Sequence, residues 1–115
     1  MLHAAVLLVT AFTVPTLNTT TVISITNPTA GSTVNRSGGM FPVTGSYANV
    51  PNGSTIVAEV LDANGKIIGA GMITNQGGTN TFLINVASQP GTGCTVRVTV
   101  IGTTANASEA NITIN

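Results

Sequence analysis

The residues that could do chemistry are few and scattered along this chain of 115 residues. They are one histidine, one cysteine and three carboxylates: His3, Cys94, Glu59, Asp62 and Glu109. A Ser-His-Asp triad needs its histidine held on a scaffold, and His3 lies at the very start of the chain. One cysteine, one histidine and three separated carboxylates do not form a metal-ligand pattern. We therefore expect no catalytic, metal or cofactor site, and no enzyme activity.

The remaining candidates have simpler interpretations. Glu59 and Asp62 are three residues apart at the end of an expected strand, whereas acid–base catalysis needs two carboxylates held around a substrate. The segment Gly91-Thr92-Gly93 is a turn between strands, because no helix follows it to complete a phosphate-binding loop. Cys94 is expected to be a small core residue, with an intermolecular disulfide as the alternative.

Charge excludes one class of partner. Charged residues make up 5% of the chain, and their formal net charge is zero. The three basic residues, Arg36, Lys66 and Arg97, are too few and too far apart to bind nucleic-acid phosphates. A near-neutral surface also lacks the repulsion that keeps copies of a protein apart. The composition therefore excludes nucleic acid and favours association.

Alternation of apolar and polar residues predicts an all-β domain from Val22 to Asn115. Helical periodicity is absent, and glycine and proline interrupt the chain often. About seven short strands of this kind favour an antiparallel sandwich over a small barrel. The residues expected to face inward are Ile23, Ile25, Phe41, Val43, Tyr47, Ile56, Ala58, Val60, Phe82, Ile84, Val86, Val96, Val98, Val100, Ala110, Ile112 and Ile114.

Three local signals refine this prediction. The segment Asp62-Ala63-Asn64-Gly65 predicts a hairpin with a primed turn, because Asn-Gly accepts positive φ. Pro42 has no amide hydrogen, so its strand should be an edge strand or begin with a bulge. Phe41 and Tyr47 share the inward parity of Val43, which favours a core position over a sugar-stacking platform.

Residues 22–115 resemble bacterial and viral immunoglobulin-like domains. The residues that carry the resemblance are Ile25-Thr26-Asn27-Pro28 with Gly31, then Val43-Thr44-Gly45-Ser46-Tyr47, then Val60-Leu61-Asp62 with Asn64-Gly65 and Gly69. The paired cysteines and core tryptophan of antibody domains are missing. The resemblance therefore implies an immunoglobulin-like antiparallel β-sandwich of the cysteine-free kind found in adhesins, surface fibres and phage structural proteins.

Residues 1–21 form an apolar N-terminal arm and linker that this sandwich does not need. The linker, Thr16–Thr21, is polar and is expected to swing away from the sandwich. The arm residues expected to make contacts between subunits are Ala4, Ala5, Val6, Leu7, Leu8, Val9, Ala11, Phe12 and Val14.

Four interpretations of the arm compete. A secretory signal peptide would have a basic flank and a small-x-small cleavage site, and the arm has neither. A transmembrane helix needs about 20 apolar residues, and Thr10, Thr13 and Pro15 interrupt the run. A third interpretation is an extra strand of the chain's own sandwich. We favour the fourth, a strand that pairs with a neighbour's sheet edge and fills its pockets with alternate side chains.

The arm and a resemblance to tailed-phage capsid decoration proteins together imply a non-enzymatic virion protein on the capsid exterior. Its expected partners are the lattice of the major capsid protein and sister subunits, in a homotrimer set by capsid symmetry. Membrane and nucleic-acid partners are not expected. The alternatives are an exported subunit of a bacterial or archaeal surface filament assembled by donor-strand exchange, and an adhesin or carbohydrate-binding module. Sequons at Asn18, Asn35, Asn52, Asn106 and Asn111 leave glycosylation open.

Overall fold

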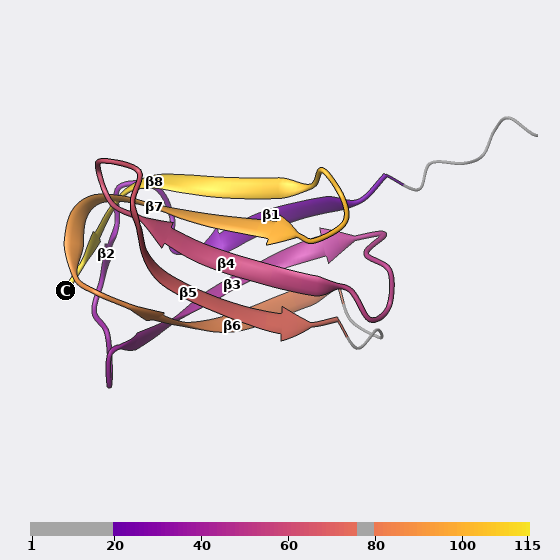
Figure 1. Ribbon diagram of the computed structural model, residues 1–115, viewed down its shortest axis with the longest axis horizontal. Helices are drawn as coiled ribbons and strands as arrows, with labels where there is room; N and C mark the ends of the chain where they lie inside the picture. The colour runs from indigo at the N-terminus through magenta and orange to yellow at the C-terminus, as the bar shows by residue number, and fades with distance from the viewer. Residues whose placement is uncertain (1–19, 76–79) are drawn as a thin grey trace, which may run out of the picture.

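The computed structural model describes residues 20–75 and 80–115, which form eight strands and no helix (Figure 1). The all-β prediction is therefore confirmed. The two-residue strand β2 is an element that the sequence pattern did not indicate. The strands are β1 (Val22–Asn27), β2 (Thr33–Val34), β3 (Met40–Ala48), β4 (Thr55–Leu61), β5 (Ile67–Thr74), β6 (Thr81–Ser88), β7 (Gly91–Val100) and β8 (Asn106–Ile114).

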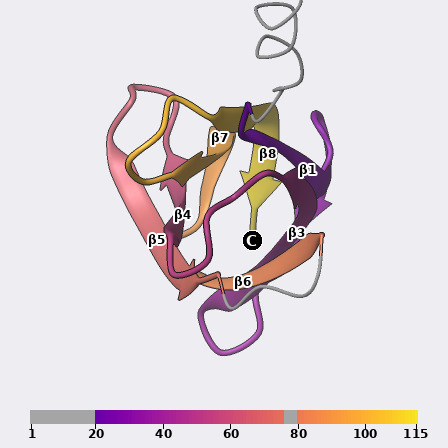
Figure 2. The same ribbon diagram turned by 90° about the vertical axis from the view of Figure 1, so that its right-hand side faces the viewer.

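The eight strands form one continuous sheet in the order β1-β3-β6-β5-β4-β7-β8-β2. Neighbouring strands are antiparallel except β2, which runs parallel to β8. Figure 2 shows that the sheet curls, so that β1, at one end of the order, comes beside β8. The arrangement is thus an open, curled sheet whose inner face surrounds the core.

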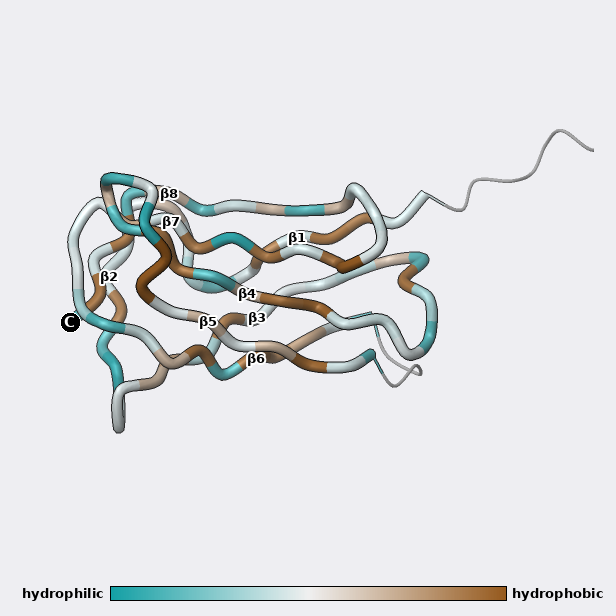
Figure 3. The backbone as a smooth tube through the Cα atoms, in the orientation of Figure 1, coloured by the Kyte–Doolittle hydropathy of each residue, from teal (hydrophilic) through white to brown (hydrophobic). Residues whose placement is uncertain are grey.

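The core lies on the inner face, where alternate residues of the strands meet. Apolar and polar stretches alternate along the strands in Figure 3, as a half-buried sheet requires. Ile25 and Tyr47 are half-buried and pack against this core. The predicted inward residues that are buried are Ile23, Phe41, Val43, Ile56, Ala58, Val60, Phe82, Ile84, Val86, Val96, Val98, Val100, Ile112 and Ile114.

Ala110 is the exception: it is exposed, so its predicted inward position is wrong. The register of β7 with β8 shifts between Cys94↔Ile112 and Val96↔Glu109. Asn111, between these pairs, adopts a left-handed φ of 59°. One extra residue in β8 forms a bulge, and a one-residue slip moves every preceding side chain to the other face.

The hairpin between β4 and β5 is confirmed, but its predicted primed turn is wrong. Within this loop, which the structure describes completely, only Gly65 has a positive φ, of 84°. The Asp62 carboxylate accepts hydrogen bonds from the amides of Asn64 (2.8 Å) and Lys66 (2.9 Å). The loop is therefore held by the hydrogen bonds of the Asp62 carboxylate, and it needs only one residue of positive φ, Gly65, where a type I′ turn needs two.

Glycines allow β5 to approach β6 and keep the sheet continuous. The pairing of these two strands is short, from Gly69↔Ser88 to Ala70↔Ala87. A Cβ on Gly71 would overlap the carbonyl oxygen of Asn85. Only a residue without a side chain fits this close approach of two backbones.

Candidate functional site

The contact residues predicted for the arm lie outside the described part of the chain, as do His3 and the rest of residues 1–19. These predicted contacts are Ala4, Ala5, Val6, Leu7, Leu8, Val9, Ala11, Phe12 and Val14. The structure describes the place where the linker meets the sheet, and the surfaces that another chain could contact.

Thr20 and Thr21, the last two linker residues, are fixed to the end of β3 by Asn49. The Thr21 hydroxyl donates to the Asn49 carbonyl oxygen at 2.7 Å, and the Asn49 side-chain amide donates to the Thr20 carbonyl oxygen at 3.0 Å. Asn49 holds a left-handed φ of 58°, which asparagine tolerates better than most residues. The linker is therefore not free over its whole length, because its last two residues continue the path of β1 beside β3.

A buried asparagine stabilises the loop next to this attachment. Asn75 is 4% exposed, and its side-chain oxygen accepts a hydrogen bond from the Tyr47 hydroxyl at 2.6 Å. Its amide donates to the carbonyl oxygens of Val50 (3.1 Å) and Pro51 (3.2 Å). Sequence reasoning missed this role because an asparagine after a strand usually indicates an exposed turn. We call this end of the curled sheet the Asn75 end.

Pro42 lies at the opposite end of the sheet, at a gap in the pairing on the side of β3 that faces β1. The pairing of β1 with β3 stops at Asn27↔Thr44, and the next contact on this edge is the double backbone bond between Ser37 and Met40 (2.8 and 3.1 Å). Alternate residues of a strand direct their backbone groups to the same edge, so Pro42 faces the same side as Met40 and Thr44. The prediction that Pro42 lies in an edge strand, or in one that begins with a bulge, is wrong: β3 lies between β1 and β6 and pairs with β6 from Met40 onward without a register shift. Only the part of β3 at Pro42 lacks a partner strand on the β1 side.

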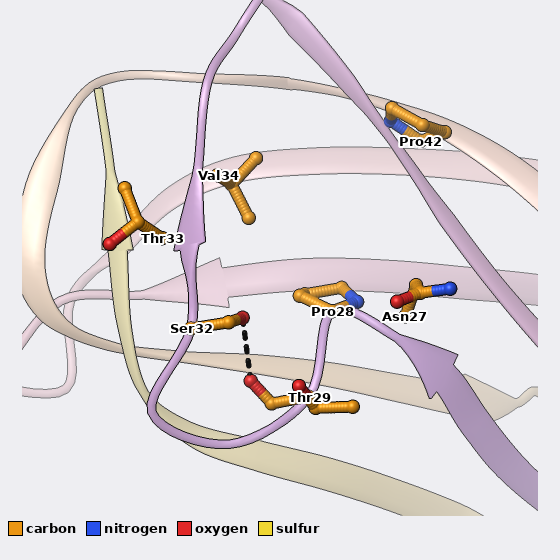
Figure 4. A pocket seen from close by; sticks show the side chains of 7 residues that line it. All are labelled: Asn27, Pro28, Thr29, Ser32, Thr33, Val34 and Pro42. Carbon is orange, nitrogen blue, oxygen red and sulfur yellow. Dashed lines mark hydrogen bonds between the residues drawn. The ribbon is translucent and has the colours of Figure 1, made fainter.

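A pocket of about 230 Å³ opens beside this gap (Figure 4). It lies between the end of β1, the segment of β2 and the start of β3. Ser32 closes one wall by donating its hydroxyl to the Thr29 carbonyl oxygen at 2.7 Å. None of the lining residues is charged, and they are Asn27, Pro28, Thr29, Ser32, Thr33, Val34 and Pro42. The pocket therefore suits an apolar or neutral polar group. We call this end of the sheet the Pro42 end.

The outer face of β1, β3 and β6 carries no charged residue. A shallow hollow of about 550 Å³ crosses it, lined by residues that include Thr44 and Leu83. By contrast, the outer face of β4 and β7 carries an ion pair between Glu59 and Arg97, at 2.8 Å. The outward residues of the uncharged face are Val22, Ser24, Thr26, Met40, Pro42, Thr44, Ser46, Ala48, Thr81, Leu83, Asn85 and Ala87.

The carboxylates and the thiol have structural partners. Glu59 pairs with Arg97, Asp62 holds its hairpin, and Glu109 accepts a hydrogen bond from the Ala30 amide at 3.1 Å. Cys94 is a fully buried free cysteine, which confirms the predicted core position. Burial, and to a smaller extent the nearby Asp62 carboxylate, raises the pKa of this thiol, which keeps it protonated and unreactive at neutral pH.

Neither a cluster of metal ligands nor a helix able to span a membrane is present among the described residues. In residues 20–75 and 80–115, no three or more His, Cys, Asp and Glu side chains gather as metal ligands. The same part of the chain contains no helix with the length and apolar character needed to cross a membrane.

Comparison by sequence gives no match, neither to a protein family nor to a curated protein. The site must therefore be judged by its own geometry. That geometry consists of a fixed point of attachment for the arm, an uncharged pocket and an uncharged sheet face.

Proposed function

We propose that this chain is a non-enzymatic structural protein of a virion, which decorates the exterior of a tailed-phage capsid and cements it through the arm. The partners in this proposal are the lattice of the major capsid protein and sister subunits. The proposal rests on one observation: an apolar arm without Asp, Glu, Lys or Arg precedes a domain whose core is already built from residues between Ile23 and Ile114. Exposure of an apolar segment of this size to water is unfavourable, so contact with a partner that covers the segment is favourable.

In this proposal the domain is an immunoglobulin-like sandwich, a finer assignment that the strand order supports. One layer would consist of β1, β3 and β6, in the positions of strands A, B and E of that fold. The other would consist of β4, β7 and β8, in the positions of strands C, F and G. Strand β5 then pairs with both layers and makes the sheet continuous.

The energetics favour a lattice over an isolated pair of chains. Burial of Ala4–Val9 would remove on the order of 300 Å² of apolar surface, or roughly 8 kcal/mol at about 25 cal/mol/Å². Ordering the same segment costs about 1–2 kcal/mol per residue, so a single arm gains little. A symmetric array makes each further contact intramolecular, and many weak contacts then hold firmly.

The second candidate is a subunit of an exported surface filament, in which the arm of each copy binds the next. One observation favours it: the linker joins the sheet at the Asn75 end, and the uncharged pocket opens at the Pro42 end. A contact between two different surfaces of the same chain repeats head to tail, and it gives a ring where the rotation closes or a filament where it does not.

The experiment adds charge to the arm of the full chain. In the variant Val6→Asp with Leu8→Asp, two carboxylates would have to be desolvated on docking, so we expect loss of assembly in sedimentation velocity runs. The matched control, Thr16→Asp with Asn18→Asp, adds the same charge to the linker and should assemble like the native chain. Assembly of the arm variant to the native extent would contradict the proposal.

Electron cryo-microscopy of the native assemblies separates the two candidates. Closed trimers, or density on the outside of a capsid, support decoration. Continuous threads support the filament.

A further inference from the structure

The pocket opens beside a gap in the pairing of β3, and this gap leaves no backbone N–H of Pro42 without an acceptor. Its position is covered neither by β1, which ends its pairing at Thr44, nor by Ser37, which pairs with Met40. A proline at this position has no N–H to leave unsatisfied, so the edge stays open to another group at little cost. The carbonyl oxygen of Pro42 faces the same side and can accept a hydrogen bond.

The chemistry of the pocket matches that of the arm. Its lining contains no charged side chain, and Pro28, Val34 and Pro42 give it an apolar character. The segment from Ala4 to Val14 is also uncharged and consists of alanine, valine, leucine, threonine and phenylalanine. A volume of about 230 Å³ accepts one or two apolar side chains rather than a whole strand.

The geometry favours an arm from a different copy. Asn49 fixes the linker at the Asn75 end, and β1 separates that point from the pocket by its six residues, or about 20 Å. The path of Thr20 and Thr21 continues β1 away from the pocket. The eleven residues from Ala4 to Val14 would span about 36 Å when extended, so length alone allows the arm to reach a pocket on either copy. The direction of Thr20 and Thr21 is what favours the second copy.

We infer that the pocket beside Pro42 is the acceptor site for the apolar segment Ala4–Val14 of a second copy of this chain. An apolar side chain of that segment fills the pocket, between the end of β1 and the start of β3. The inference rests on the proposed function and specifies which surface receives the arm. The attachment point of the linker and the acceptor pocket lie at opposite ends of each copy, so the proposed contact is head to tail and builds rings or filaments.

The test is disulfide trapping between two full-length single variants. One carries Thr29→Cys at the exposed rim of the pocket, and the other, with a purification tag, carries Leu8→Cys in the arm. The native Cys94 is buried in both and serves as a common background. After mixing and mild oxidation, a docked arm should give a heterodimer on a non-reducing gel, roughly tenfold above the control because docking raises the local thiol concentration.

The matched control replaces Thr29→Cys by Thr104→Cys, an exposed threonine in the loop between β7 and β8 at the Asn75 end. Equal yields from the two positions would overturn the pocket as acceptor. The proposed function would still stand after such equal yields if the Val6→Asp, Leu8→Asp variant fails to assemble in the same buffer, because the arm would then be needed for assembly but would dock elsewhere.

A double variant distinguishes a second copy from the arm's own chain. When Thr29→Cys and Leu8→Cys are present in one chain, head-to-tail docking predicts a ladder of covalent multimers. A fast-migrating monomer with an internal disulfide, without multimers, would mean that the arm folds back on its own pocket and would overturn the inference.

Discussion

The two ends of the curled sheet differ in how they treat backbone groups that no neighbouring strand pairs with. At the Asn75 end, a buried side-chain amide satisfies loop carbonyl groups that no strand covers. At the Pro42 end, an uncovered strand edge carries a residue with no amide hydrogen to satisfy. The first solution fixes the loops around the attachment of the arm, and the second leaves an opening. The difference separates an end whose loops are held by the chain's own side chains from an end that has an unpaired strand edge, the one where we proposed that a second copy docks.

The largest expected effect is at the Asn75 end. Asn75→Ala removes the acceptor of the hydrogen bond from the Tyr47 hydroxyl and the donor to two backbone carbonyl oxygens, so we expect a loss of about 2–4 kcal/mol in the free energy of unfolding. Urea unfolding measures it. The exposed Asn80→Ala is the control and should change stability by less than about 0.5 kcal/mol. Equal effects at both positions would remove the distinction between a structural amide and a surface one.

The next effect tests how firmly the Pro42 end is held. The Arg36 guanidinium donates to the carbonyl oxygens of Asn115 (2.9 Å) and Ser88 (2.7 Å), which links β6 to the last residue of the chain. Arg36→Ala should therefore cost about 1–2 kcal/mol in thermal or urea unfolding. Arg36→Lys keeps the charge but not the forked geometry, and we expect it to recover less than half of the loss.

Pro42→Ala should have a smaller effect on stability. The substitution restores an N–H on an edge where water can reach it, and it gives back conformational freedom to the unfolded chain, so we expect a loss below about 1 kcal/mol. Hydrogen exchange of the new amide measures the opening directly. Strong protection of this amide in the isolated domain would show that the edge is closed, contrary to the comparison of the two ends.

The smallest effect is the pH dependence of Cys94. Burial raises the pKa of its thiol in the folded state, so the folded chain holds this proton more tightly than the unfolded chain. Stability from this group is therefore full below the unfolded pKa, about 8.5, and falls as pH rises through the higher folded value. Unfolding free energies at pH 7 and above pH 9 should diverge for the native chain, and Cys94→Ala should remove that slope. An identical slope in the variant would assign it to other groups.

The strands were predictable because their alternation is local. Val96, Val98 and Val100 identify a half-buried strand from their own spacing, and the structure buries all three. Ala110 was placed wrongly because the bulge at Asn111 depends on the register with β7, which the spacing within β8 does not contain. The hairpin after β4 was found, but its turn type was decided by the Asp62 side chain.

Of the candidate site, the sequence predicted only the composition: an apolar arm and few charged residues. The arm and the lack of charge were visible in the sequence, whereas the uncharged pocket was not, because its walls come from β1, β2 and β3. Asn75 was overlooked for the same reason: its partner Tyr47 is 28 residues away along the chain.

The sequence by itself determined the all-β class of the fold and the apolar, nearly uncharged character of the chain. The alternation of side chains is a local pattern, and composition can be read without knowing any contact. Only the tertiary structure decided which edge of β3 stays open at Pro42 and which asparagine becomes buried. Both depend on hydrogen-bond partners brought together by the curl of the sheet, and no short stretch of sequence encodes that geometry.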